Sequence, residues 1–219
     1  MPAPASPLLQ EIAARGEIWR GGAAAKIRAE ASGIAALDAR LPGGGWPAGA
    51  ISELFIEAHG IGELSLALPL LARLTQAERH VAFVAPPHIP YAPALAQAGL
   101  ALAHTLIVEP RTADETIWAA EQLLRSAAFG AVLAWTANLR EADSRRLQLA
   151  AETTGNLGLV YRPASTRGAA GVAALRLKLA RREGRLEIEI LKLRGGRAGA
   201  RFFADEPAPA RAARASEAA

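Results

Sequence analysis

The chain has 219 residues, 51% of them apolar, which is typical of a single α/β domain with short appendages. It contains no cysteine, and this excludes disulfide bonds and cysteine-ligated zinc. The net charge of +4 is uneven, because nine Lys/Arg and only three Glu lie between Arg176 and Arg201. A basic segment of this kind permits contact with nucleic acid or an acidic protein, although it is also typical of a solvated surface.

Residues 1–32 predict an arm and a linker ahead of the folded domain. The first ten residues lack the basic and apolar regions of a secretory signal, and no run of about 18 apolar residues predicts a membrane span. We therefore expect a cytoplasmic protein. Apolar residues at helical spacing (Leu8, Leu9 and Ile12) indicate a short helical arm, extending to Trp19, for self-association or partner binding. A frayed, unattached helix is the alternative.

Residues 33–200 predict the folded domain, and its centre is a strand, a glycine-containing turn and a helix. The run ISELFI, 51–56, predicts a buried strand; a turn at 57–62 follows, and an apolar helix is expected from Glu63. This is the layout of a phosphate-binding loop, in which backbone N–H groups and a helix N-terminus cradle phosphates.

The residues that nucleotide chemistry requires are missing from this loop. With Gly62 as the second glycine of G-x-x-x-x-G-K-[ST], the first glycine falls on Glu57, the lysine on Glu63 and the hydroxyl residue on Leu64. Two carboxylates would repel a triphosphate by several kcal/mol in a partly dry site. No lysine lies between Lys26 and Lys178. We therefore expect a degenerate loop that binds no nucleotide, and a protein that is not an enzyme and needs no cofactor.

The rest of the domain alternates apolar runs with helical patterns. Further strands are expected at 80–85, 102–108, 131–135 and 157–161, and further helices at 34–41, 91–98, 113–128 and 141–153. Such alternation predicts a mostly parallel sheet with helices on both faces. Period-2 runs at 173–181 and 186–193 around a glycine turn predict a β-hairpin that extends the sheet antiparallel at one edge. Residues 201–219 predict a flexible tail.

Basic side chains of this hairpin are the candidate contacts to DNA phosphates or an acidic partner. Arg176 and Lys178 share one strand face, opposite Leu175, Leu177 and Leu179, so the basic stripe is directional. The candidate residues are Arg176, Lys178, Arg181, Arg182, Arg185, Lys192, Arg194 and Arg197.

Two other groups of side chains favour structural roles. Trp118 and Trp135 lie on elements that should pack, so core positions are favoured over a base-stacking platform. The four histidines are scattered without the spacing of metal ligands, and we expect no metal site.

The order of these elements resembles the core of RecA-type ATPases. Carried over residue by residue, the P-loop lysine corresponds to Glu63, the catalytic glutamate to Pro87 and the magnesium-side aspartate to Trp135. A closer resemblance is to ImuA, a RecA-like family without ATPase motifs. The similar blocks are LPGGGWPAG at 41–49, APPHIPYAPA at 85–94, 118–135, RRLQLAA at 145–151 and LKLRGG at 191–196.

The ImuA resemblance implies a RecA-like fold and a role in damage-inducible mutagenesis. The chain would act as a scaffold in the SOS response, linking an ImuB-like Y-family polymerase homologue to an error-prone DnaE-type polymerase in translesion synthesis, with RecA and DNA as further partners. The SulA-type cell-division inhibitors share the middle blocks, and a SulA-like inhibitor that binds FtsZ is the alternative. We expect the Trp46 block and the full hairpin in ImuA rather than in SulA.

Overall fold

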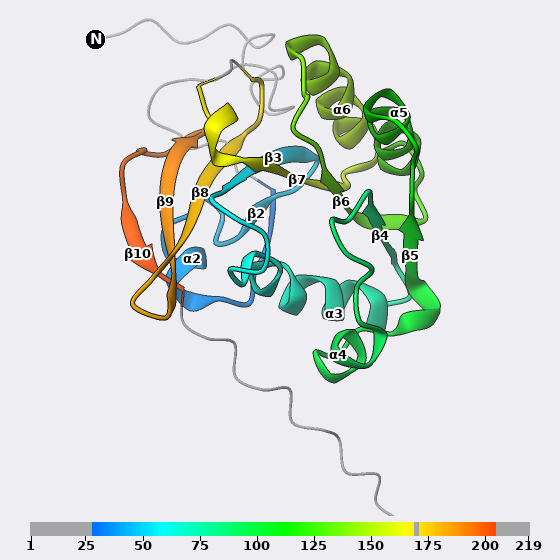
Figure 1. Ribbon diagram of the computed structural model, residues 1–219, viewed down its shortest axis with the longest axis horizontal. Coiled ribbons are helices and arrows are strands. Elements are labelled where there is room, and N and C mark those ends of the chain that lie inside the picture. Colours follow the sequence, from blue (N-terminus) through cyan, green and yellow to red (C-terminus); the bar gives the residue numbers. More distant parts are fainter. Residues whose placement is uncertain (1–27, 169–170, 205–219) are drawn as a thin grey trace, which may run out of the picture.

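A computed structural model describes residues 28–168 and 171–204, which form a mixed α/β unit. Its centre is an eight-stranded sheet with the order β10-β9-β8-β3-β7-β6-β4-β5 (Figure 1). The strands β8, β3, β7, β6, β4 and β5 run parallel, β9 pairs antiparallel with β8, and β10 pairs antiparallel with β9. The strands are β3 (Ala50–Ile56), β4 (His80–Val84), β5 (Thr105–Val108), β6 (Phe129–Trp135), β7 (Leu157–Pro163), β8 (Leu175–Arg182), β9 (Arg185–Leu193) and β10 (Arg201–Phe203).

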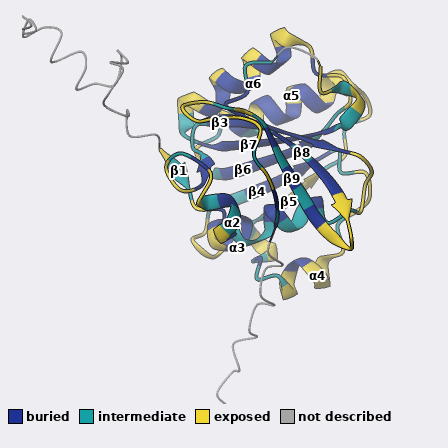
Figure 2. Ribbon diagram, turned by 90° about the vertical axis from the view of Figure 1, so that its left-hand side faces the viewer, coloured by how far each residue is buried: buried dark blue, intermediate teal, exposed yellow. Residues whose placement is uncertain are grey.

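Helices cover both faces of the sheet, which confirms the mostly parallel α/β arrangement predicted from the sequence (Figure 2). One face carries α2, α3 and α4, and the other carries α5 and α6. In the described part of the chain no helix combines the length and hydrophobicity needed to cross a membrane. The helices are α2 (Ala35–Asp38), α3 (Leu68–Gln76), α4 (Ala92–Gln97), α5 (Ala113–Leu124) and α6 (Glu141–Thr154), with 3-10 turns η1 (Glu63–Leu66), η2 (Leu102–His104) and η3 (Ala164–Thr166).

The strand β3 contributes to both hydrophobic cores because its side chains alternate between the two faces. Leu54 and Ile56 pack in the core under α2 and α3, whereas Ile51 packs in the core under α5 and α6. All seven residues of β3 are buried, although one of them is the charged Glu53. The buried strand β3 therefore positions the degenerate loop, which begins at its carboxyl end.

Several element boundaries differ from the sequence prediction. The helix expected from Glu63 begins with η1, and α3 starts only at Leu68, where Pro69 occupies its first turn. The strand expected at 102–108 begins at Thr105 after η2. The helix expected at 113–128 ends at Leu124, because the side chains of Thr154 and Asn156 bond to the Leu124 carbonyl.

The two ends of the described chain also contribute strands that the sequence did not indicate. β1 (Ala29–Glu30), in the expected linker, pairs antiparallel with β2 (Trp46–Pro47), and β10, in the expected tail, pairs with β9. The hairpin β8–β9 extends the sheet as expected, but its first strand pairs parallel with β3 and only β9 is antiparallel.

A group of ion pairs joins α5 to α6. Glu121 of α5 bonds to Arg146 of α6 and to Arg125 at 2.9 Å. Asp143 of α6 accepts a 2.7 Å hydrogen bond from Arg140. That hydrogen bond lowers the pKa of Asp143, and its effect exceeds the opposing effect of burial.

We expect Gly158→Ala to destabilise the fold. A Cβ at Gly158 would lie 2.8 Å from the Cγ2 of buried Ile51, so the core must shift, at a cost of about 1–3 kcal/mol. Urea denaturation measures the difference. Gly168→Ala is the control, since a Cβ there meets nothing within 4 Å. Equal urea midpoints for Gly158→Ala and Gly168→Ala would contradict the close packing of β7 on β3.

We expect Asp143→Asn to lower stability at neutral pH by about 1–2 kcal/mol, because a charge-assisted hydrogen bond is lost. A carboxylate whose pKa is lowered in the folded state stabilises it above the unfolded pKa, and this stabilisation disappears as the pH falls through the folded pKa. The difference in stability between the variant and the native chain should therefore begin to shrink as the pH falls below about 4, and it should disappear only below the lowered pKa of the folded state. The control is Asp114→Asn, which removes the exposed partner of Arg140. An undiminished difference at low pH would contradict this account.

Candidate functional site

The degenerate loop follows β3 at the edge of the sheet where the parallel strands end. Residues 57–62 connect β3 to η1, with Gly60 and Gly62 at positive φ angles of 77° and 95°. Only glycine adopts such angles without strain, so these two residues set the path of the loop. The geometry of a glycine turn between strand and helix is present, as the sequence predicts.

Glu63 occupies the interior of this loop with its own carboxylate. The Gly60 N–H donates to Glu63 Oε1 at 3.2 Å, and the Glu63 residue is only 7% exposed. In a phosphate-binding loop such N–H groups bond to phosphate oxygens. In this chain an internal anion is therefore already bonded to a loop N–H.

Glu57, the other carboxylate of the loop, is fastened to β8. Lys178 lies 2.9 Å and Arg182 3.0 Å from Glu57 Oε1, and the hydrogen bond from Lys178 is the main cause of the lowered pKa of Glu57. Arg181 donates to the carbonyl oxygen of Ile61 at 3.3 Å. Three basic side chains of β8 thus hold the loop from one side.

Aromatic side chains fill the space beside the loop. Trp135 stacks on Tyr161 at 4.7 Å between ring centroids and on Phe83 at 6.1 Å. A pocket of about 240 Å³ borders this stack, and Pro87 is among its lining residues. None of the described residues that line it is acidic, and they include Trp135 and Pro87, the two residues that the RecA resemblance aligns with ATPase carboxylates.

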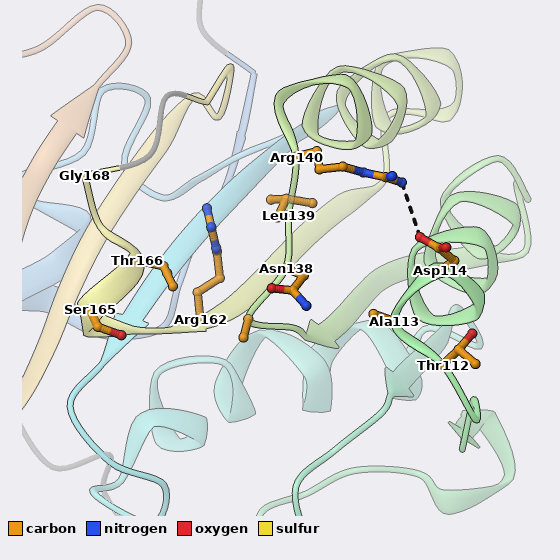
Figure 3. Close-up of a pocket in the computed structure, with 11 residues that line it drawn as sticks. Thr112, Ala113, Asp114, Asn138, Leu139, Arg140, Arg162, Ser165, Thr166 and Gly168 are labelled. Carbon is orange, nitrogen blue, oxygen red and sulfur yellow. Dashed lines mark hydrogen bonds and ion pairs between the residues drawn. The ribbon is translucent and has the colours of Figure 1, made fainter.

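A buried ion pair lies behind the loop, and the sequence analysis did not single it out. Glu53 of β3 accepts a 2.6 Å bond from Arg162 Nη1 of β7, and Arg176 of β8 approaches Glu53 to 3.7 Å. Glu53 is fully buried and Arg162 is 3% exposed. In the sequence, the available signal for this pair was a charged residue, Glu53 or Arg162, within each of two largely apolar strand segments. Arg162 also lines a larger pocket, of about 860 Å³ (Figure 3).

The structure places the predicted basic stripe largely in internal contacts. Arg176 and Lys178 share a face opposite three fully buried leucines, as expected, but they pair with Glu53 and Glu57. Lys192 donates to the Gly171 carbonyl, and the Arg185 guanidinium lies over the Phe203 ring. Contact of the eight basic candidates with DNA or an acidic partner stays a prediction. The arm candidates Leu8, Leu9, Ile12 and Trp19 lie outside the described residues.

The placement of Trp118 in the core was wrong. Its side chain is 60% exposed, because α5 packs through a face that includes Ile117, Ala120 and Leu124. Trp135 is half-buried in the aromatic stack. Among the described residues, no three potential ligands of the His, Cys, Asp and Glu types come together as a metal site.

An apolar surface flanks the free edge of β5 and was not predicted. Leu106 and Ile107 of β5 are both exposed, and no charged residue occurs from Leu100 to Val108. Edge strands in natural proteins are usually protected by charges, so an uncharged edge is typical of a partner-binding surface. The name edge surface is used below for the exposed large hydrophobic residues of β5 and of the elements next to it in the chain, which lie on both faces of the sheet: Ile89, Tyr91, Leu102, Leu106, Ile107 and Trp118.

Comparison with known proteins gives one family. The model of the family described as "Cell division inhibitor SulA" matches residues 49–158, which run from β3 to the start of β7. A cell division inhibitor SulA from Edwardsiella piscicida is 32% identical over 95 residues. That similarity covers 43% of this chain and 56% of the relative, so the chain spans about half the length of the curated relative it matches.

We expect Tyr161→Phe to leave stability unchanged or to raise it by up to about 1 kcal/mol. The Tyr161 hydroxyl is buried without a hydrogen-bond partner among the described residues, and burial and then Glu63 raise its pKa. Removing an unsatisfied hydroxyl removes its desolvation cost. The measurement is the midpoint of urea unfolding.

Thr75→Val is the matched control for Tyr161→Phe, because it removes a buried hydroxyl that does form hydrogen bonds. Thr75 Oγ1 donates to the Leu71 carbonyl at 2.9 Å and accepts from the Ala101 N–H at 3.0 Å. Its loss should cost about 1–3 kcal/mol. A loss of that size in Tyr161→Phe as well would contradict the unbonded state of the Tyr161 hydroxyl.

Proposed function

The chain belongs to the SulA family, and from this premise we propose that it is a non-catalytic, protein-binding inhibitor of cell division with FtsZ as its target. The protein would act in the damage-induced SOS response, and its activity would be the binding of a partner rather than a reaction.

The observation that carries this proposal is the position of the exposed apolar side chains. All seven large hydrophobic residues that are exposed in the described chain, the six of the edge surface and Leu149, lie within the matched segment 49–158. None lies in the described residues after it. Exposed aromatic and aliphatic residues are enriched at protein interfaces. The part of the chain shared with SulA is therefore also the part that offers a surface for a protein partner.

The state of the loop supports the absence of catalysis. Glu63 takes the position of the P-loop lysine and bonds to Gly60, Glu57 is paired with β8, and Trp135 and Pro87 replace the two acids. We propose that the strand, glycine turn and helix are a RecA-like framework that has lost its ATPase site. Measurement of ATP binding and hydrolysis with magnesium, beside a RecA control, tests this element of the proposal; saturable ATP binding would overturn it.

We expect overproduction of the chain to cause filamentous growth, and the purified chain to bind FtsZ. The double variant Tyr91→Ser with Trp118→Ser should weaken binding by about thirtyfold or more, because truncation of even one aromatic hot-spot residue costs about 2 kcal/mol or more. Leu149→Ser is the matched control, since Leu149 is exposed to the same 60% as Trp118 but lies on α6. Equal loss in both variants, or no FtsZ binding by the native chain, would contradict the proposal.

A second candidate is the translesion role, in which the chain links an ImuB-like factor and RecA to a DnaE-type polymerase. The observation that favours it is that two blocks of the ImuA resemblance, 41–49 and 191–196, fall largely or wholly outside the segment matched to SulA. The first includes the fully buried Trp46, and the second begins near the end of β9.

Paired binding assays with FtsZ, ImuB-like protein and RecA separate the two candidates. Retention of FtsZ alone supports the first. Retention of the ImuB-like protein or RecA, with damage-induced mutagenesis lost on deletion and no filamentation on overproduction, supports the second.

A further inference from the structure

A small pocket lies at the amino end of β3, which is the other end of that strand from the degenerate loop. We call it the amino-end pocket. Its volume of about 250 Å³ is below the range of about 300–1,000 Å³ that is typical of small-molecule sites, so it suits a single side chain. Its walls come from the segment 41–50, from Arg28 and Glu152, from Ala174 just before β8, and from Leu193 and Arg194 at the end of β9.

The amino-end pocket joins two segments that the proposed function does not use. The block 41–49 forms one wall, and Leu193 and Arg194 of the block 191–196 form another. The SulA family model covers residues 49–158, so these walls lie almost wholly outside it. They adjoin β3, β8 and β9, whereas the edge surface lies at β5, the far edge strand of the sheet. The pocket is therefore a site separate from the edge surface.

Backbone contacts fix the walls of this pocket in the absence of any ligand. The Ala48 N–H donates to the Arg28 carbonyl at 2.9 Å. The Arg194 N–H donates to the Ala174 carbonyl at 2.8 Å. A Cβ at Gly45 would lie 2.1 Å from a carbonyl oxygen of β1, so only glycine lets the chain before β2 approach β1 this closely. Because the walls are already ordered, a ligand loses little affinity to ordering them.

The side chains in these walls are largely apolar. Leu41 is 5% exposed, and Pro42, Pro47 and Leu193 are half-buried. Leucine and proline side chains carry no hydrogen-bond donor or acceptor. The pocket therefore suits an apolar side chain, which gains stability by leaving water.

Two arginines without partners line the same pocket. Arg28 and Arg194 are exposed, and neither guanidinium has a hydrogen bond or ion pair among the described residues. The acid among the described lining residues, Glu152, already accepts a 2.7 Å hydrogen bond from Gln148. A carboxylate beside the bound apolar side chain would therefore meet two available cations. The apolar walls and Glu152 disfavour a nucleic-acid backbone, whose binding requires a row of cations.

We propose that the amino-end pocket binds an acidic segment of a partner protein. One apolar side chain of the segment enters the pocket, and carboxylates beside it pair with Arg28 and Arg194. Burial in the apolar walls supplies affinity, and the two arginines supply charge complementarity and orientation. The inference goes beyond the proposed function and does not rest on it, because neither FtsZ nor the edge surface takes part.

The test uses the full chain labelled with ¹⁵N, so that the backbone amides of 41–49 and 191–194 report binding. The probes are the blocked peptide Glu-Glu-Leu-Glu-Glu and its analogues Gln-Gln-Leu-Gln-Gln and Glu-Glu-Gly-Glu-Glu, at about 0.15 M salt, where distant surface charges are largely screened. The first peptide should shift these amides saturably. Each analogue should bind about fivefold more weakly or worse, because it lacks either the charges or the apolar side chain.

Two further probes represent the other occupants of this pocket. They are a single-stranded oligonucleotide and a blocked peptide with the sequence of residues 7–20 of this chain. Both should bind more weakly than Glu-Glu-Leu-Glu-Glu. Tighter binding of the oligonucleotide would assign the pocket to nucleic acid, and tighter binding of the 7–20 peptide would assign it to the arm of the chain itself. Either result would overturn the proposal.

Charge reversal establishes where the acidic peptide binds. Arg194→Glu should weaken its binding by about fivefold or more and leave the glutamine analogue unaffected, because an attraction is replaced by a repulsion. Arg197→Glu is the matched control, since Arg197 is also exposed and lies in the same segment but is not among the residues that line the pocket. It should retain affinity within about twofold. Absence of a saturable shift, equal binding of the glutamine analogue, or equal loss in the two arginine variants overturns the proposal.

Discussion

The buried ion pair between Glu53 and Arg162 connects the strands on which the rest of the structure depends. Glu53 lies directly opposite Arg176 on β8 in the register of the sheet, and Arg162 faces Phe55, two residues along β3. The Arg162 and Arg176 guanidinium groups also lie over the Phe55 ring, at 5.4 and 4.7 Å from its centroid. Breaking a buried pair by removing one partner costs about 3–5 kcal/mol. A shift in register would separate Glu53 from its partners and leave a buried charge unpaired, so the pair disfavours other registers of β7, β3 and β8.

The strands that this pair connects also hold the loop that follows β3. β3 carries Glu53 within the sheet and ends just before Glu57, and both carboxylates are bonded to basic residues of β8. Glu63 satisfies the Gly60 N–H from the opposite end of the loop. In an ATPase the phosphates and magnesium provide the charges that hold such a loop. In this chain the carboxylates of Glu57 and Glu63 and the basic residues of β8 make such contacts within the protein itself.

Features that are local in the sequence were predictable, and those decided by distant partners were not. The run ISELFI and the glycines after it define β3 and its turn, and Thr112 with Glu115 defines the start of α5. The role of Glu53 depends on Arg162, 109 residues later in the chain, and no local pattern indicates that pairing. Trp118 follows the buried Ile117 on an amphipathic helix, and only the position of α5 on the sheet decides which of the two is exposed. The two-residue strand β1 likewise exists only through its pairing with β2.

The two halves of the sheet differ in the character of their side chains. The β4–β5 half lies within the segment matched to SulA, and its free edge is uncharged and apolar. The β8–β10 half lies outside that segment, and Arg176, Lys178 and Arg182 of β8 pair with Glu53 of β3 and with Glu57 just after it. The net charge of +6 along this stretch of sequence therefore does not become an equally basic surface, because Glu53 and Glu57, two acids from another part of the chain, neutralise part of it. The basic residues of β8 therefore first hold β3 and the loop after it. A binding partner could contact only the basic side chains of the C-terminal strands that are not paired with Glu53 or Glu57.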